Sequence, residues 1–360
     1  MNATAADPVS WVRPEVRALK AYHLDLTPSR YKLDQNEVPF DLPRALKRRV
    51  AALLLERSWA RYPDFHSDAL RAALGRLHGW PAAGVLVGCG SNELLGVALE
   101  ALAGPGREVL ATRPSFSLYE TLIVRAHAAP RYVTADEDLR LPLARLREAV
   151  DEDPRRPLLL CSPNNPTGDA LTAGEVDDLL GRLSAPLLLD NAYGEFCDHD
   201  YRPLLDRHRH LILFRTFSKA WSLGGLRLGY LLADPALAAE LLKVKLPYNV
   251  SFVSAAAGEA ILEARQAAER RVRVLLGRRP QWASMLSAAG FQVYPSQANF
   301  LLARHRRAPE IGRALDRRGI RVRVLGGHPV LAECLRFSVG DGPALRAVRA
   351  ALREIMEEPS

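Results

Sequence analysis

The residues best suited to covalent chemistry lie in the loop that begins at Thr216. Lys219 follows an apolar run, Leu211–Phe214, that predicts a buried strand, and Arg227 comes eight residues after the lysine. The chain has only six lysines against 43 arginines, so a primary amine at this position stands out. A lysine can lose its proton near neutral pH and condense with an aldehyde, which an arginine cannot do. On its residue type alone Lys219 reads as a solvated surface lysine, but the hydroxyls and the guanidinium around it favour a ligand that carries an aldehyde and a phosphate.

An acid and an amide follow two other apolar runs. The run Ala185–Leu189 leads to Asp190, and Tyr193 comes three residues after the acid. A buried carboxylate is costly without a partner, and a protonated ring nitrogen would supply one and keep the ring an electron sink. The string Ser162–Gly168 holds two prolines and a glycine, which fix a rigid loop and direct the Asn165 side chain. A turn stabilised by Asx hydrogen bonds explains this composition but not its place directly after a predicted strand.

A glycine-rich turn, Gly88–Glu93, joins a predicted strand at Gly84–Val87 to a predicted helix at Leu94–Leu102. Such a turn presents unpaired N–H groups at the start of a helix, which suits a phosphate, and Ser91 lies within it. The turn lacks the third glycine of the dinucleotide motif GxGxxG, because Asn92-Glu93 lies where that glycine would be needed. It therefore disfavours a nicotinamide-dependent dehydrogenase.

These strings, in this order, resemble the class I/II aminotransferases. Thr216–Gly229 matches their lysine motif, S/T-x-S-K-x(7)-R-x-G. Leu33–Pro39, which reads L-x-x-N-E-x-P, and Ser296–Phe300 resemble boxes of the histidinol-phosphate aminotransferases in particular. The resemblance implies a pyridoxal 5'-phosphate enzyme with the aspartate-aminotransferase-like fold type I, and a homodimer with shared active sites.

The resemblance also implies a role for each residue near the cofactor. Lys219 would bond to the cofactor aldehyde and act as general acid and base, and Asp190 would keep the ring nitrogen protonated. Asn165 and Tyr193 would donate to the phenolic oxygen, and Phe116 would stack on the ring, with core packing as its alternative role. The phosphate would be held by Ser91, Asn92, Thr216, Ser218 and Arg227, together with Tyr62 of the partner subunit.

Two arginines near the C-terminus are the candidates for binding the substrate. Arg336 lies inside an apolar strand with no acid beside it, and a buried arginine needs an anionic partner. Arg323 alternates with valines, so by itself it reads equally well as a solvent-facing arginine. By resemblance these two residues would bind the substrate anions, with Tyr22, Asn36 and Asn165 as further contacts.

The resemblance implies transfer of an amino group between L-histidinol phosphate and 2-oxoglutarate in histidine biosynthesis. An aromatic or other amino-acid aminotransferase, or a threonine-phosphate decarboxylase, would use the same scaffold, and the decarboxylase would not depend on 2-oxoglutarate. A regulator that only senses pyridoxal phosphate would carry a helix-turn-helix domain, for which the segment before Tyr31 is too short.

The order of predicted elements favours an α/β fold, because helices and strands alternate from about residue 66. The resembling family implies a large domain with a mostly parallel seven-stranded sheet, plus a smaller α+β domain. The expected division is an N-terminal arm at 1–42 that contributes to the small domain and the dimer, a large cofactor-binding domain at 43–247 and a small C-terminal domain at 248–360.

Composition limits the remaining function classes. The chain of 360 residues has a net charge of +8, but its arginines are spread along the sequence, which disfavours nucleic-acid binding. No apolar run approaches the roughly 20 residues of a membrane span, and no signal-peptide core is present, so we expect no membrane and a cytoplasmic protein. The four cysteines form no CxxC pair and no metal spacing, so we expect reduced core residues and no metal.

Overall fold

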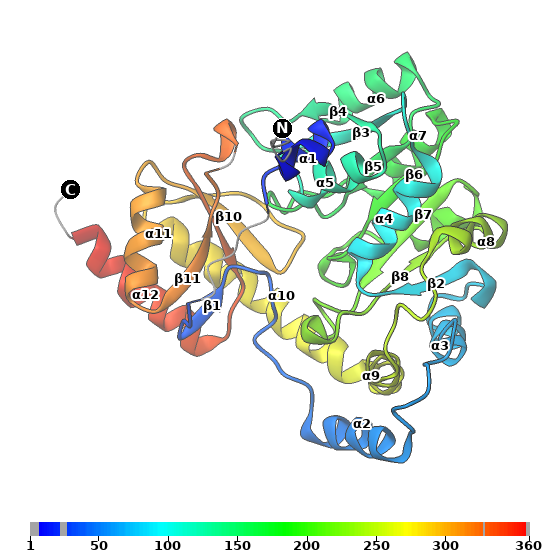
Figure 1. Ribbon diagram of the computed structural model, residues 1–360. Helices are drawn as coiled ribbons and strands as arrows, with labels where there is room; N and C mark the ends of the chain where they lie inside the picture. Colours follow the sequence, from blue (N-terminus) through cyan, green and yellow to red (C-terminus); the bar gives the residue numbers. More distant parts are fainter. Residues whose placement is uncertain (1–6, 22–26, 327, 358–360) are drawn as a thin grey trace, which may run out of the picture.

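Two β-sheets lie side by side, and the long helix α10 (Arg265–Ala288) reaches from one to the other (Figure 1). The structure is a computed structural model that describes residues 7–21, 27–326 and 328–357. None of the helices within these ranges is long and apolar enough to cross a membrane.

The larger sheet has seven strands in the order β2-β8-β7-β6-β5-β3-β4. Strand β8 is antiparallel to both of its neighbours, and all the other pairs are parallel. The expectation of a mostly parallel seven-stranded sheet is therefore confirmed. The strands are β2 (Val85–Gly88), β3 (Glu108–Arg113), β4 (Ala129–Thr134), β5 (Leu158–Cys161), β6 (Leu187–Asp190), β7 (Leu211–Thr216) and β8 (Gly229–Leu232).

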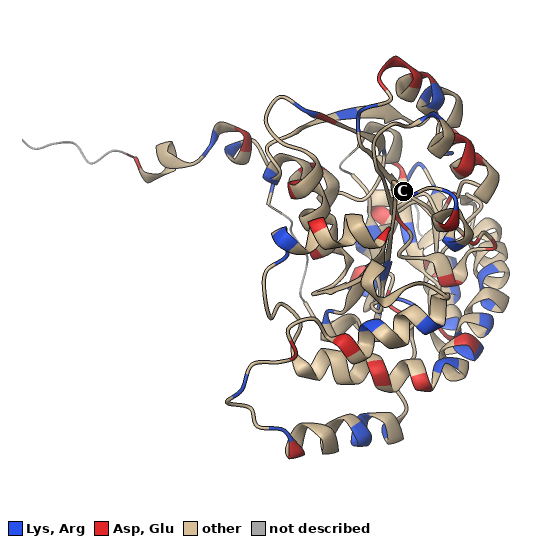
Figure 2. Cartoon of the chain, turned by 90° about the vertical axis from the view of Figure 1, so that its right-hand side faces the viewer, with Lys and Arg blue, Asp and Glu red and all other residues tan. Residues whose placement is uncertain are grey.

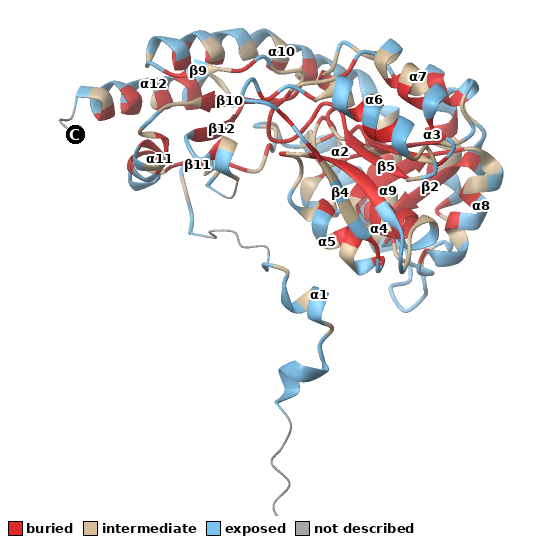
Figure 3. Cartoon of the chain, turned by 90° about the horizontal axis from the view of Figure 1, so that it is seen from above, coloured by how far each residue is buried: buried red, intermediate tan, exposed pale blue. Residues whose placement is uncertain are grey.

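Leucine runs form the centre of this sheet because both of its faces are covered by helices. Side chains alternate along a strand, so Leu188 packs in the apolar cluster under α4, α5 and α8, whereas Leu187 and Leu189 pack in the cluster under α6 and α7. Figure 3 shows the central strands buried and the helices buried only along their inner sides. The covering helices are α3 (Asp68–His78), α4 (Ser91–Leu102), α5 (Leu118–Arg125), α6 (Leu143–Glu152), α7 (Ala173–Arg182) and α8 (Pro235–Val244).

The smaller sheet has five strands in the order β1-β11-β12-β10-β9. Its edge strand β1 comes from the N-terminal part of the chain and pairs in parallel with β11, whereas the other pairs are antiparallel. The strands are β1 (Tyr31–Leu33), β9 (Gln292–Val293), β10 (Phe300–Arg304), β11 (Ile320–Val324) and β12 (Cys334–Ser338), and the helices α11 (Ala308–Arg317) and α12 (Gly342–Glu357) accompany them.

The remaining helices are α1 (Pro14–Arg17), α2 (Arg44–Glu56) and α9 (Phe252–Glu263), and α2 packs against α9. Single turns of 3-10 helix occur at Pro8–Trp11, Ala82–Gly84, Gly194–Phe196, Arg202–Asp206, Gly224–Leu226 and Pro329–Leu331. Figure 2 shows that basic and acidic residues are interspersed along the helices on one side of the molecule.

The sequence also predicts a short helix at Pro14–Ala21 and a strand at Phe291–Tyr294. The bounds predicted for these two elements and for the helix at Leu94–Leu102 were wrong. The arm helix ends at Arg17 rather than continuing to Ala21. Helix α4 begins at Ser91 rather than Leu94, because Gly90 takes a positive φ of 83° and turns the chain one residue before it. The strand expected at Phe291–Tyr294 is only the two-residue β9.

Candidate active site

The candidate residues meet at one edge of the larger sheet. Strands β5, β6 and β7 are parallel, so their carboxyl ends lie together, and the loops that follow them carry Asn165, Tyr193 and Lys219. Asp190 is the last residue of β6. Strand β8 is antiparallel to both β2 and β7, so β2 runs in the same direction as β7. The turn from β2 into α4 therefore brings Ser91 to the same edge of the sheet.

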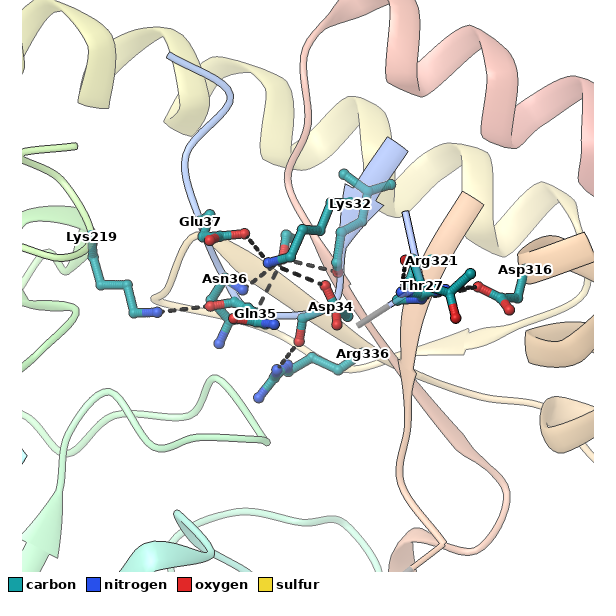
Figure 4. A network of polar contacts seen from close by, with 12 residues as sticks. Thr27, Lys32, Asp34, Gln35, Asn36, Glu37, Lys219, Asp316, Arg321 and Arg336 are labelled. Atoms are coloured by element: carbon teal, nitrogen blue, oxygen red, sulfur yellow. Dashed lines mark hydrogen bonds and ion pairs between the residues drawn. The ribbon is translucent and has the colours of Figure 1, made fainter. Parts of the chain in front are cut away.

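The amine of Lys219 lies at the junction of the two sheets. Its Nζ donates a hydrogen bond of 2.8 Å to the carbonyl oxygen of Gln35, in the loop after β1 (Figure 4). Burial, and after it the charge of Arg336, lowers the pKa of Lys219 to about 7, with Arg227 acting in the same direction and Glu37 opposing it. A large share of this amine is therefore neutral at physiological pH, the form that attacks a carbonyl carbon.

Asp190 is a carboxylate only 3% exposed. It accepts a hydrogen bond of 2.7 Å from the hydroxyl of Tyr119 and one of 3.2 Å from the backbone N–H of Ala192. Burial raises the pKa of Asp190 to about 6 in spite of these hydrogen bonds. Among the residues that the structure describes, no lysine, arginine or histidine forms an ion pair with it. A buried acid placed in this way suits a cationic ligand group.

Two side chains link the smaller sheet to this edge. Asn36, which is 1% exposed, donates from its Nδ2 a hydrogen bond of 2.9 Å to the hydroxyl of Tyr193. Arg336 donates to Oδ1 of Asn165 and, over 2.5 Å, to the carbonyl oxygen of Asp34. Burial raises the pKa of Tyr193, so its hydroxyl keeps its proton at neutral pH.

The start of α4 forms a candidate cradle for an anion. The first turn of this helix, which contains Ser91 and Asn92, has no side-chain cap. The guanidinium of Arg227 lies close to Gly90: a Cβ added at Gly90 would be 2.8 Å from Nη2 of the arginine. The same guanidinium donates a hydrogen bond of 3.2 Å to Oγ of Ser218. Uncapped N–H groups facing a hydroxyl and an arginine suit a phosphate.

Thr216 lines the loop after β7, where its Oγ1 accepts a hydrogen bond of 3.1 Å from the N–H of Ser218. Phe116 is half-buried at the start of α5, with its ring edge-on to that of Tyr119 at 5.6 Å. Tyr119 carries the hydroxyl that holds Asp190, so Phe116 lies near the acid.

The two candidate substrate arginines face each other across the smaller sheet. Arg323 and Arg336 are directly opposite in the antiparallel pair β11–β12, so their side chains leave the same face. Arg336 is 7% exposed and Arg323 is half-buried. Like charges placed directly opposite are destabilising unless an anion offsets them. Arg321, two residues before Arg323, is paired with Asp316 at 3.0 Å (Figure 4).

One described residue among those predicted for the site does not join this group. Tyr62 is 76% exposed and stacks on Tyr248 with a centroid distance of 4.6 Å. Tyr22 lies outside the described residues.

Comparisons with known proteins agree with this geometry. A family model described as "Aminotransferase class I and II" matches residues 28–352. The chain belongs to the class I and II aminotransferase family. The resemblance predicted from its motifs is thereby confirmed.

The relatives of this aminotransferase include histidinol-phosphate aminotransferases. The enzyme of Deinococcus radiodurans is 36% identical, with 96% of this chain and 97% of the relative covered. That of Chlorobium phaeovibrioides is 35% identical, with 93% and 94% covered. Among solved structures, the histidinol-phosphate aminotransferase of Sinorhizobium meliloti in complex with pyridoxal-5'-phosphate has a TM-score of 0.87 at 24% identity, covering 98% of this chain and 99% of that one.

Other solved structures share the fold of the aminotransferase. A Thermus thermophilus aspartate aminotransferase mutant has a TM-score of 0.79 at 20% identity, over 96% of this chain and 98% of its own. The L-threonine-O-3-phosphate decarboxylase of Porphyromonas gingivalis has the same TM-score at 21% identity, over 91% and 100%. The aspartate-aminotransferase-like fold is therefore confirmed.

Sequence reasoning missed two contacts in the site of this aminotransferase. Tyr119 holds Asp190 although 71 residues separate them, and its only sequence signal is a tyrosine three residues after Phe116. The carbonyl of Gln35 has no signal at all, since any residue supplies a backbone oxygen.

Proposed function

We propose that this aminotransferase uses pyridoxal 5'-phosphate to transfer the amino group of L-histidinol phosphate to 2-oxoglutarate, a step of histidine biosynthesis. The observation that carries this proposal is the arginine pair, Arg323 and Arg336, on the sheet face next to the lowered-pKa amine of Lys219. The naming of the relatives at 35–36% identity over nearly the whole chain supports the choice of substrate.

The residues present fit the cofactor. The buried carboxylate of Asp190, which forms no ion pair with a described residue, suits a protonated ring nitrogen, and the uncapped start of α4 beside Arg227 and Ser218 suits a phosphate. When bound, the cofactor supplies an electron sink that stabilises negative charge at the substrate α-carbon. The residues that would hold it are Asp190 for the ring nitrogen, Asn165 and Tyr193 for the phenolic oxygen, Phe116 for the ring face, and Ser91, Asn92, Thr216, Ser218 and Arg227 for the phosphate.

Lys219 is the proposed general acid and base. With a pKa of about 7 its amine is divided between the neutral and protonated forms near neutral pH. The neutral Nζ can take the proton from the α-carbon of the substrate, and the resulting ammonium can give it back later. Gln35 orients this nitrogen through its carbonyl oxygen.

The arginine pair is the proposed site for the substrate anion. The proposed amino donor, histidinol phosphate, carries a phosphate where the amino acceptor, 2-oxoglutarate, carries a carboxylate. The same pocket must therefore bind both anions. A guanidinium binds either group through paired hydrogen bonds. Asn36 and Asn165 complete the proposed contacts from the described residues, with Tyr22 as a further candidate.

We further propose a homodimer in which Tyr62 of one subunit reaches the phosphate cradle of the other. Its support is the exposed apolar surface around Tyr62, which includes Trp59 at 73%, Leu246 at 70% and Tyr248 at 42% exposure. The proposed division into an arm at 1–42 and domains at 43–247 and 248–360 assigns one sheet to each domain, with β1 lent by the arm. A cytoplasmic location is part of the proposal and is supported by four free cysteines.

One coupled assay tests the choice of substrate. Histidinol phosphate, phenylalanine, tyrosine and aspartate are compared as donors with 2-oxoglutarate as acceptor, and kcat/KM for histidinol phosphate should exceed that for the other three. A higher value for an aromatic donor would assign the enzyme to aromatic amino acids instead. Release of carbon dioxide from threonine phosphate without 2-oxoglutarate would assign it to decarboxylation.

A further inference from the structure

A buried ion pair lies beneath the candidate site. Arg215 lies in β7, and Glu195 lies in the loop after β6. Nη2 of Arg215 donates a hydrogen bond of 2.9 Å to Oε1 of Glu195. The two side chains are 13% and 14% exposed, and no other ion pair of the described residues has both partners so deeply buried. Keeping two charges out of water requires further hydrogen bonds.

Those hydrogen bonds tie together the three strand ends that carry the site. Oε1 of Glu195 also accepts a hydrogen bond of 2.9 Å from the indole N–H of Trp221, which lies two residues after Lys219. Nη1 of Arg215 donates a hydrogen bond of 2.6 Å to Oδ1 of Asn191, the residue that directly follows Asp190. Asn191 in turn donates 2.7 Å from its Nδ2 to the carbonyl of Ser162, at the start of the loop that holds Asn165.

The space around this network is filled. A Cβ added at Gly194 would lie 2.2 Å from Oδ1 of Asn191 and 2.5 Å from Nη1 of Arg215. The loop after β6 therefore closes directly over the guanidinium. Both charged residues therefore contact or lie in a loop that carries residues of the site.

We propose that Arg215 and Glu195 are positioning residues, whose buried pair holds Lys219 in register with Asp190 and Tyr193. This inference rests on the role proposed for Lys219 but not on the identity of the amino donor. Neither residue has to touch the substrate or the cofactor. A displacement of about 1 Å at reacting groups is enough to slow a reaction by roughly a hundredfold.

The test measures Lys219 in the cofactor-free protein, where no substrate is involved. The pH dependence of its labelling by a small amine-reactive reagent is followed by mass spectrometry in Glu195→Gln, Arg215→Gln and the double variant. The charged groups around this amine, Arg336, Arg227, Lys32, Glu37 and Asp190, remain unchanged. Arg147→Gln, which breaks an ion pair of 2.7 Å with Asp178 between α6 and α7, is the control.

We expect all three variants to raise the apparent pKa of Lys219 by about one unit, because a displaced amine gains water. With the cofactor and donor added, kcat should fall about 10- to 100-fold with a smaller change in KM, and the control should match the original protein in both readouts. If the pair acted only through its charges, the two single variants would shift the pKa of Lys219 in opposite directions and the double variant would leave it unchanged.

A purely structural role is recognised by a second outcome. Thermal stability would then fall while the labelling profile of Lys219 and kcat per folded molecule stayed the same, which overturns the proposal. Should the charge variants fail to fold, Trp221→Phe keeps the ion pair, removes one hydrogen bond to Glu195 and should move the labelling profile in the same direction; an unmoved profile overturns the proposal. Because the labelling needs no donor, failure of histidinol phosphate as substrate would count only against the proposed function.

Discussion

Asp190 is held in a state that the protein alone does not favour. Burial raises the pKa of this carboxyl to about 6, against an ordinary value of 3.8. The folded protein therefore binds the proton more tightly than the unfolded chain, so the charged carboxylate destabilises the cofactor-free fold above pH 6. Below about pH 4 both states are protonated and the penalty is absent.

Asp190→Asn should therefore stabilise the cofactor-free protein at pH 8 while lowering its affinity for the cofactor. A shift of about two units corresponds to about 3 kcal/mol, and loss of one of the two accepted hydrogen bonds takes back about 1 kcal/mol, so we expect a gain of about 1–2 kcal/mol. Urea unfolding at pH 8 and pH 4 measures it. A gain of equal size at both pH values would contradict a titration of Asp190 as the cause.

Arg336 is the proposed contact of the substrate anion, and it also influences Lys219. Its charge is the largest influence after burial in lowering the pKa of the lysine. Arg336→Gln should raise the pKa of Lys219, so the acidic limb of the pH profile of kcat should move to higher pH. It should also reduce kcat/KM for an anionic donor about 10- to 100-fold through loss of a charge-assisted hydrogen bond.

Steady-state kinetics from pH 6 to 9 measure both effects, with Arg318→Gln as a control, since that arginine pairs with Glu354 on α12. An unmoved acidic limb in Arg336→Gln would separate the arginine from the chemistry of Lys219.

At the scale of elements, the segment from β1 to Glu37 joins the smaller sheet to the site. Its residues Asp34 and Gln35 contact Arg336 and Lys219, respectively (Figure 4). The next residue, Asn36, contacts Tyr193. Two hydrogen bonds fix the backbone of Asn36. Its N–H donates one of 2.9 Å to Oγ of Ser338, and its carbonyl oxygen accepts one of 3.0 Å from Nδ2 of Asn299.

Asn36 adopts a positive φ of 55°, which asparagine and glycine tolerate better than other residues. Asn36→Ala and Asn36→Gly both lose the hydrogen bond to Tyr193, so their difference isolates the backbone. We expect the alanine variant to be less stable than the glycine variant by about 1 kcal/mol in chemical denaturation. Greater stability of the alanine variant would show that this turn is not constrained.

The strands of the larger sheet that consist of leucine could be predicted from the sequence, and so could the loops that follow them. Strand β4 could not, because it contains Pro130 and Arg131 and is half-exposed at the sheet edge. The pairs Tyr119–Asp190 and Asn36–Tyr193 could not be predicted either. They join residues 71 and 157 positions apart, and only the packing of the elements brings them together.

At the scale of the whole molecule, the exposed aromatic surface around Tyr62 predicts that two subunits share each site. Tyr62→Ala and Lys219→Ala should each be impaired, the first several-fold and the second almost completely. A mixed dimer of the two contains one site with both original residues, so mixing equal amounts should restore about a quarter of the original activity if subunits exchange freely.

Activity of the mixture is measured after the two variants have been denatured together and refolded. Activity no greater than the mean of the separately refolded variants would contradict a shared site. Tyr31→Phe, at the edge of the smaller sheet, is the control. Its mixture with Lys219→Ala should show only the mean of the activities of the two separately refolded variants.

The most direct measurement concerns the bond between Lys219 and an aldehyde. The purified protein is incubated with pyridoxal 5'-phosphate, reduced with borohydride, digested and analysed by mass spectrometry. We predict a protein that is yellow before reduction and that afterwards carries the reduced cofactor on Nζ of Lys219, with no attachment at any lysine in Lys219→Ala. Attachment to another of the six lysines, or to none, would contradict the account.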